Sequence, residues 1–202
     1  QVGEYARLRG IDKMLLAITE SGQRAARIVA NMLSFCRKSS STHIPCSLPQ
    51  LLDQTVELVA SDYDLKQNVD FRQLEIVREY ADVPDVLCES GQIQQVILSL
   101  LKNSSYALHS KQEGAQIILR VFAEDKSILF QVEDNGTGMN VEACKRAFEP
   151  FFTTKEVGTG TGLGLSTSYF IITQNHQGDI SVNSELGKGS CFTVSLPLRK
   201  PV

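Results

Sequence analysis

The sequence predicts an α+β fold, in which helices cover one face of a mixed β-sheet, preceded by a long helix from a helical bundle. Apolar residues recur at steps of three and four over residues 4–38, which is helical spacing. A polar stretch at 39–46 then indicates a linker. From residue 47 onward, strand and helix patterns follow one another without strict alternation, which favours a mixed sheet. We therefore expect three parts: 1–38, 39–46 and 47–202.

Composition argues against several classes of function. The 202 residues carry a net charge of −3, so no basic field indicates a nucleic-acid partner. No apolar run approaches the roughly 20 residues that span a bilayer, and no signal peptide opens the chain. Scattered cysteines without a CxxC pair indicate small buried thiols in a cytoplasmic protein, and argue against a zinc site or a disulfide scaffold. They are Cys36, Cys46, Cys88, Cys144 and Cys191.

The long helix carries a wide apolar stripe. Its heptad seam is joined by a second apolar edge at Leu16, Ile28 and Phe35. A stripe of this width needs more than one neighbour, as in a four-helix bundle. We expect the helix to pair with another chain or with a helix upstream, and packing on its own domain is the alternative. The seam consists of Leu8, Ile11, Leu15, Ile18, Gly22, Ala25, Val29, Met32 and Cys36.

The elements of the domain follow from local patterns. Residues 47–61 predict an amphipathic helix with a proline in its first turn, and residues 88–110 predict another with one apolar face. Two alternating segments that meet near Asp125–Lys126 predict a hairpin. Two more strands close the domain around the sequence LGKG. The expected strands are 69–80 (one or a pair), 115–125, 126–134, 178–185 and 190–198, and the remaining expected helices are about 140–147 and 162–177.

A glycine-rich segment, KEVGTGTGLGLSTSYF at 155–170, comes directly before the last expected helix. A helix N-terminus offers unpaired N–H donors to a phosphate group, and glycines let the backbone approach one closely. The segment matches neither GxxxxGK[ST] nor GxGxxG behind a strand, which are the two commonest phosphate motifs. Glycines alone favour the alternative, a flexible surface loop.

Three other segments bear on this choice. Asn103, inside a helix, is either a solvated asparagine or an amide oxygen ligand for Mg²⁺. Asp134 opens DNGTGM after a strand, and there it either forms an ordinary turn or accepts a hydrogen bond from an amine. The segment FEPFFTTK at 148–155 either packs its three phenylalanines in the core or also directs Lys155 at a phosphate.

Taken together, the order and spacing of these segments resemble the ATP-binding catalytic domain of bacterial sensor histidine kinases, in the superfamily that includes gyrase, Hsp90 and MutL. The resemblance covers about 47–198 and implies a two-layer sandwich of the Bergerat type. Upstream, ITESGQRAARIVANMLSFCRKSS resembles the second helix of the dimerisation and histidine-phosphotransfer hairpin. The matching segments are an N box (Gln94–Ala107), a G1 box (Asp134–Met139), an F box (Phe148–Lys155), a G2 box (Gly158–Leu165) and the last glycine motif GKGSCF (187–192).

The resemblance implies a nucleotide site that binds ATP and Mg²⁺. In it, Asn103 is the Mg²⁺ ligand, Asp134 binds the adenine amine, and Lys155 contacts phosphate. Gly136 and Gly138 would flank the adenine pocket, where they leave room for a flat ring. The resemblance also implies a mobile lid with Gly160, Gly162 and Gly164, and a water-mediated adenine contact for Thr193. The other expected site residues are Tyr106, Met139, Phe152, Thr154, Thr161, Leu163 and Leu165.

Two positions depart from the family. Ser99 stands where many members have Asn and where the hydrolysing relatives have a Glu that activates water, which argues against an ATPase cycle. Tyr106 stands where family kinases often have Lys or Arg, so Lys102 or Lys155 must offset the phosphate charge. A superfamily ATPase and a degenerate nucleotide-binding module remain the alternative functions.

None of the three histidines matches the family's phosphoacceptor, which lies in a helix directly before an acidic residue. We expect His43, His109 and His176 at the surface or in the linker. The sequence therefore predicts a catalytic part that binds ATP–Mg²⁺ but does not phosphorylate itself. The resemblance implies a homodimer through the helical bundle and a response regulator as partners. It implies no nucleic acid, and it leaves open whether the parent protein is membrane-anchored.

Overall fold

The computed structural model describes residues 10–19, 21–22, 43–61, 74–109, 111, 113–155 and 160–198. Its main sheet has five strands in the order β2-β4-β5-β7-β6. Strands β2 and β4 run parallel and the other neighbours antiparallel, so the sheet is mixed. The strands are β2 (Glu75–Tyr80), β4 (Gln116–Glu124), β5 (Ser127–Asp134), β6 (Asp179–Glu185) and β7 (Gly189–Pro197).

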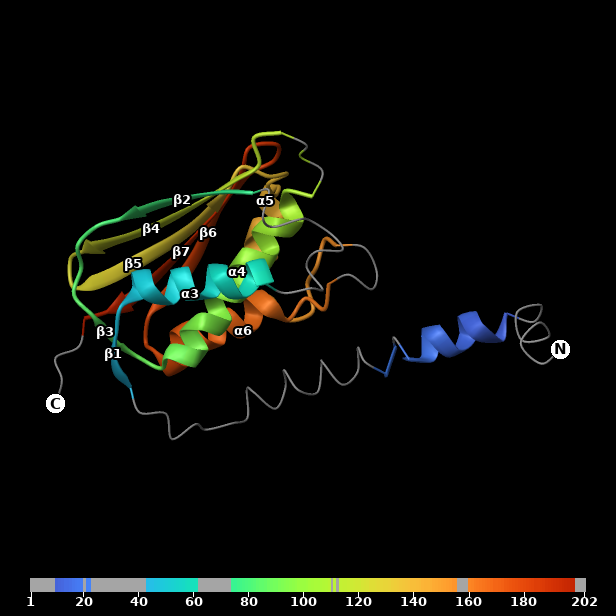
Figure 1. The fold of residues 1–202 in the computed structure, drawn as a ribbon, viewed down its shortest axis with the longest axis horizontal. Helices are drawn as coiled ribbons and strands as arrows, with labels where there is room; N and C mark the ends of the chain where they lie inside the picture. Colours follow the sequence, from blue (N-terminus) through green and yellow to red (C-terminus); the bar gives the residue numbers. More distant parts are fainter. Residues whose placement is uncertain are drawn as a thin grey trace.

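Helices α3, α4 and α6 lie on one side of this sheet (Figure 1), which confirms the predicted α+β fold. The core lies between the two layers. Five apolar side chains of α4 are fully buried there, against alternate residues of β4 and β5. The helices are α3 (Leu48–Ser61), α4 (Ser90–Ala107), α5 (Val141–Arg146) and α6 (Gly164–Phe170), and α6 continues as the π-helix η3 (Ile171–Asn175).

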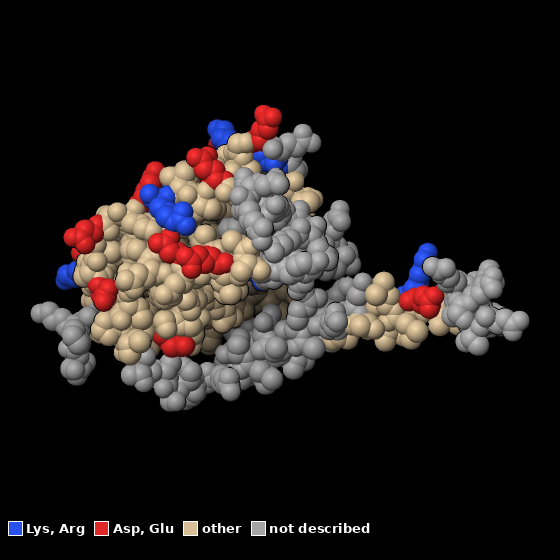
Figure 2. All heavy atoms as spheres, in the orientation of Figure 1, with Lys and Arg blue, Asp and Glu red and all other residues tan. Residues whose placement is uncertain are grey.

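The predicted hairpin is confirmed with its turn at Asp125–Lys126. In β4, buried inward residues such as Ile117 and Leu119 alternate with half-buried outward ones such as Ile118 and Arg120. On the outward face Arg120 bridges Glu79 and Glu133, and so links three neighbouring strands. Charged side chains of both signs are scattered over the described surface that Figure 2 shows.

Two short strands were not predicted. Ile44–Cys46 (β1) pairs antiparallel with Val86–Cys88 (β3), so the first strand of the domain begins inside the segment predicted to be a linker. A strand of three residues is too short to show a period of two in its sequence. Cys46 and Cys88 are buried free thiols, as expected, and burial raises the pKa of the Cys88 thiol.

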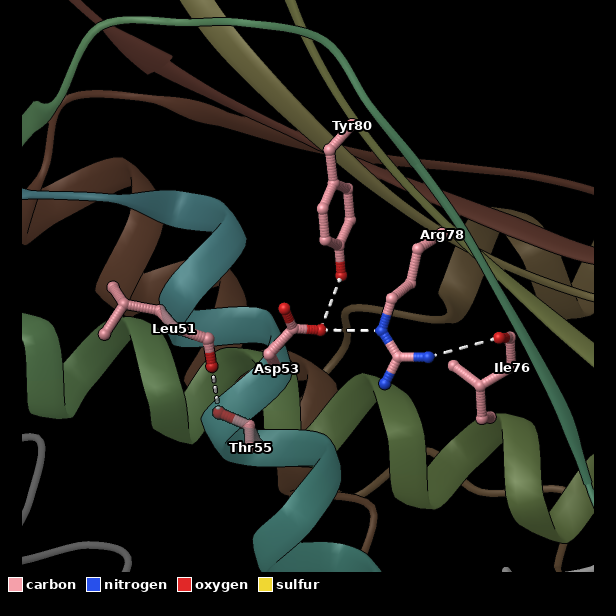
Figure 3. A network of polar contacts seen from close by, with 6 residues as sticks. All are labelled: Leu51, Asp53, Thr55, Ile76, Arg78 and Tyr80. Atoms are coloured by element: carbon pink, nitrogen blue, oxygen red, sulfur yellow. Dashed lines mark hydrogen bonds and ion pairs between the residues drawn. The ribbon is translucent and has the colours of Figure 1, made fainter.

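Helix α3 is held on the edge strand β2 by the carboxylate of Asp53 (Figure 3). Arg78 Nε donates to Asp53 Oδ1 at 2.7 Å, and the Tyr80 hydroxyl donates to the same oxygen at 3.3 Å. Burial and the neighbouring Asp53 raise the pKa of Tyr80. This network fixes the helix layer at the end of the sheet that lies farthest from β6.

The predicted long helix is described only in part. Residues 11–19 and 21–22 are helical, and the remainder of 4–38 lies outside the described residues. Four large apolar side chains on the described part are between 58% and 68% exposed: Met14, Leu15, Leu16 and Ile18. No described helix is long and apolar enough to cross a membrane.

Candidate functional site

The candidate site begins where β5 ends, at the buried carboxylate of Asp134, which is 3% exposed. Asp134 Oδ2 accepts a hydrogen bond from Ser104 Oγ of α4 at 3.1 Å. Its Oδ1 accepts from the backbone N–H of Gly136 at 3.0 Å. Burial raises the pKa of Asp134, and these hydrogen bonds oppose the rise. The carboxylate is thus oriented between the sheet and α4 before any ligand arrives.

The loop after Asp134 is pressed between two parts of the backbone. A Cβ on Gly136 would lie 2.6 Å from the carbonyl oxygen of Ala107, and one on Gly138 (φ +64°) would lie 2.1 Å from that of Glu185. A Cβ on either residue would therefore collide with protein backbone, so both positions require glycine. That Gly136 and Gly138 flank an adenine ring stays a prediction. Met139 follows in the same loop, where its N–H donates to Ser184 Oγ at 2.8 Å.

A second cluster lies on α4 one residue from Ser104. Lys155 Nζ donates to Asn103 Oδ1 at 3.0 Å. The same ammonium lies 4.4 Å from the ring centroid of Tyr106, one helical turn further along α4. Burial lowers the pKa of Lys155 to about 8. The Asn103 oxygen therefore contacts a cation in this structure, the Lys155 ammonium.

The F and G2 segments contact each other directly. Phe151 takes a positive φ of 65°, and its N–H donates to the carbonyl of Gly162 at 2.9 Å. Gly162 also has a positive φ of 66°, and a Cβ there would lie 2.4 Å from the Phe151 carbonyl carbon. The Phe152 ring lies under the Arg146 guanidinium, 4.4 Å from the centroid. The two segments thus contact each other where they flank residues 156–159, which lie outside the described residues.

Helix α6 begins at Gly164, within the G2 segment. Leu163 is buried at its N-terminal boundary, and its N–H donates to Thr161 Oγ1 at 3.4 Å. A Cβ on Gly164 would lie 2.7 Å from Ser99 Oγ, so α6 meets α4 closely at Ser99. Leu165 packs on the core. Thr154 is exposed, and Gly160 lies against the side chains of Thr153 and Lys155. The mobile lid implied for Gly160, Gly162 and Gly164 stays a prediction.

Thr193 is not brought to this site. It lies on β7 between the buried Phe192 and Val194, and Gln131 Nε2 donates to its Oγ1 at 3.1 Å. Because alternate residues of a strand face opposite sides, Thr193 faces away from the helices and from Asp134. There it lines a separate cavity of about 310 Å³ together with Ser181 and Ser195.

Ser104 and Ser190 are site residues that the sequence interpretation missed. Ser190 is buried and lies opposite Asp134 in the β5–β7 register, on the same face of the sheet. The signal was available in GKGSCF, since a period of two puts Ser190 and Phe192 on one face and Thr193 on the other. Ser104 gave no such signal, because its contact with Asp134 is tertiary.

The expectation of a surface position is wrong for His176, which is 3% exposed. Its Nε2 accepts from the backbone N–H of Glu89 at 3.1 Å, and its Nδ1 lies 2.9 Å from the carbonyl of Ile171. The first contact makes Nδ1 the protonated nitrogen, so it donates to Ile171. A ring whose nitrogens are both engaged in this way is no phosphoacceptor. His109 is exposed, and the ring of His43 lies 5.2 Å from that of His176.

The raised pKa of Asp134 predicts how stability depends on pH. Because burial favours its protonated form, the folded state holds a proton at pH values where the unfolded chain, with a pKa near 3.8, has released it. The free energy of unfolding should therefore gain from Asp134 as the pH falls through its raised pKa. We expect the free energy of unfolding of Asp134→Asn, measured in urea relative to the wild type, to be higher near pH 7.5 than near pH 4.5. An equal difference at both pH values would contradict this.

Comparison with known proteins shows the family of this chain. Residues 88–200 match the family described as histidine kinase-, DNA gyrase B-, and HSP90-like ATPase, and the chain belongs to it. Within that family it is similar to the catalytic ATP-binding part of sensor histidine kinases. Sporulation kinase E of Bacillus subtilis (strain 168) is 36% identical over 184 residues, which are 91% of this chain and 23% of that protein. Sensor kinase CckA of Brucella abortus (strain 2308) is 35% identical over an alignment of 199 residues that covers 91% of this chain and 20% of that protein.

Solved structures share the fold. Full-length ShkA in complex with AMPPNP has a TM-score of 0.73 and 25% identity, and the match covers 92% of this chain and 38% of ShkA. The catalytic domain of histidine kinase ThkA has a TM-score of 0.62 and 24% identity, and the match covers 77% of this chain and 95% of that domain. The chain spans about a fifth to a quarter of the curated relatives' length.

Proposed function

We propose that this chain binds ATP with Mg²⁺ and serves as the catalytic part of a two-component histidine kinase. One observation carries the proposal. Adjacent residues of α4, Asn103 and Ser104, contact the Lys155 ammonium and the Asp134 carboxylate. A hydrogen-bond acceptor for an amine and a cation position for phosphates thus lie side by side along one helix.

Each end of this site has a distinct task. Asp134 accepts a hydrogen bond from the adenine amine, because it is an oriented carboxylate at the start of a backbone loop. Lys155 neutralises phosphate charge in place of the basic residue that Tyr106 replaces. Phosphoryl transfer needs mainly positioning and charge neutralisation from the protein. No Asp, Glu, His or Cys cluster among the described residues could hold a metal ion by itself.

The residues fit a magnesium ion that arrives with the nucleotide. Asn103 Oδ1 would hold it, since Mg²⁺ takes few protein oxygens and completes its shell with phosphate oxygens and water. When bound, the ion offsets the negative charge of the phosphates during transfer. The Asn103 oxygen accepts a hydrogen bond from the Lys155 ammonium in this structure, so it is oriented for a cation.

The site favours a kinase over an ATPase because of Ser99. Its hydroxyl lies against Gly164, at the position where hydrolysing relatives carry a glutamate. A serine hydroxyl is far too weak a base to take a proton from water without a partner. We therefore expect no appreciable release of free phosphate from ATP by this chain, and slow steady turnover would favour the ATPase instead.

The phosphoacceptor and the partners belong to the same proposal. The γ-phosphate would pass to a histidine on a helix paired with residues 1–38, and then to an aspartate of a response regulator. A structure of histidine kinase ThkA with the response regulator protein TrrA, at a TM-score of 0.69 and 21% identity, shares the fold. The exposed apolar side chains of residues 11–19 support a homodimeric bundle. Of the predicted linker 39–46, the part before Ile44 would act as the hinge, because β1 begins there.

The metal dependence of binding tests this function. ATP affinity, measured by calorimetry with Mg²⁺ and with EDTA, should improve with Mg²⁺ for the wild type. In Asn103→Ala this improvement should fall by about tenfold, because roughly 1.4 kcal/mol of metal coordination is lost. Asn183→Ala, which removes an exposed asparagine on β6, is the matched control and should behave as wild type. Equal Mg²⁺ dependence in Asn103→Ala would refute the role of Asn103 in the site.

A further inference from the structure

The Lys155 ammonium lies at the oxygen proposed for the metal. Asn103 Oδ1 is the oxygen proposed to bind Mg²⁺, and Lys155 Nζ lies 3.0 Å from it. An ammonium and a divalent ion at one amide oxygen repel each other at close range. The two cations therefore compete for the same position.

The ammonium is held on more than one side. The Tyr106 ring lies 4.4 Å from Lys155 Nζ, so the ring face and the amide oxygen of one helix together bind the cation. The backbone of Lys155 is fixed as well, because its N–H donates to Thr153 Oγ1 at 3.1 Å. Tyr106 thus helps to hold the ammonium, where a basic residue would instead repel Lys155.

We propose that Lys155 occupies the cation position on Asn103 and Tyr106 while the domain lacks nucleotide, and that ATP–Mg²⁺ displaces it from both. The inference rests on the proposed function of the site. Phosphate oxygens give the displaced ammonium a new partner of opposite charge. Mg²⁺ alone brings no such partner. The contact of Lys155 with Asn103 and Tyr106, which we name the latch, therefore opens only when the metal and the nucleotide bind together.

Nuclear magnetic resonance can follow the latch directly. Protons that lie over an aromatic ring are shifted upfield, so the ε-methylene signal of Lys155, assigned by its loss in Lys155→Met, should be upfield in the free protein. Tyr106→Leu should abolish that shift. Mg²⁺ alone should leave the signal unchanged, and Mg²⁺ with AMP-PNP should move it to the position of an exposed lysine.

Affinity for the metal alone provides a second measurement. Mn²⁺, observed by electron paramagnetic resonance without nucleotide, should bind Lys155→Met several-fold more tightly than wild type, because no ammonium competes. Lys126→Met removes the same charge from the exposed hairpin turn, so it is the matched control and should not change Mn²⁺ affinity.

The outcomes separate the latch from the function of the site. AMP-PNP bound by calorimetry while the Lys155 signal stays upfield would overturn the latch and leave the proposed function standing. An ordinary lysine shift in the free protein would also overturn the latch. Absence of AMP-PNP binding by calorimetry would overturn the proposed function, and the latch with it.

Discussion

Replacing Asp134 with asparagine is expected to weaken ATP binding about 100-fold while the domain stays folded. The carboxylate is buried and held by Ser104 and Gly136, so it cannot turn away from the adenine amine that we propose it binds. An amide in its place removes the charge and can present its own N–H to that amine. A hydrogen bond to a charged group contributes roughly 1.5–3 kcal/mol, which corresponds to about a 10- to 100-fold change in affinity. Calorimetry with ATP and Mg²⁺ measures the loss.

The neighbouring carboxylate provides the control. Glu133 precedes Asp134 on β5 but lies on the other face of the sheet, where it pairs with Arg120. Glu133→Gln removes the same charge from the same strand and should leave the affinity for ATP unchanged. Equal losses in the two variants would show that the effect is electrostatic at long range and would contradict a direct contact at Asp134.

Replacing Gly189 with alanine is expected to destabilise the domain by about 3 kcal/mol or more. Gly189 takes φ +116°, and a Cβ there would lie 1.9 Å from the carbonyl oxygen of Asp134. Gly189 is held by its pairing with Glu185 of β6 and Asp134 by its pairing with Ser190 of β7, so neither segment can move away without breaking a ladder next to the site. Urea unfolding measures the loss, and the affinity for ATP should fall with it.

The same turn contains a control for backbone strain alone. Gly187 also has a positive φ, +81°, but nothing lies within 4 Å of its Cβ position. Gly187→Ala should therefore cost only about 1–2 kcal/mol, which is the conformational penalty of an L-residue in that region. If the two variants were equally destabilised, the close approach of Gly189 to Asp134 would not be what requires glycine.

Elements with a long, regular pattern could be predicted from the sequence. The hairpin of β4 and β5 consists of two runs rich in apolar and β-branched residues on either side of a polar turn, and α4 shows one apolar face. Helix α6 was predicted within a few residues, but its continuation as a π-helix was not. There the N–H of His176 donates to Ile171, five residues back, and the buried His176 ring contacts the N-terminus of α4. Nothing local in the sequence encodes that contact.

The candidate site shows the same division. Asn103, Asp134 and Lys155 could be named from motif spacing, and the structure brings them to two adjacent clusters on α4. What spacing could not give is which side chains meet: the hydroxyl of Ser104 on Asp134, or the Lys155 ammonium on Asn103. The family resemblance implies Thr193, although strand alternation places it on the face of β7 opposite Ser190. Contacts between distant segments depend on packing, whereas sidedness within a strand can be read from sequence.

A structure of the domain with Mg²⁺ and AMP-PNP would test the central claim most directly. The account predicts the adenine amine within hydrogen-bond distance of Asp134, the metal on Asn103 Oδ1, and Lys155 away from Tyr106 and on the phosphates. An analogue bound elsewhere, such as in the cavity beside Thr193 on the opposite face of the sheet, would contradict it.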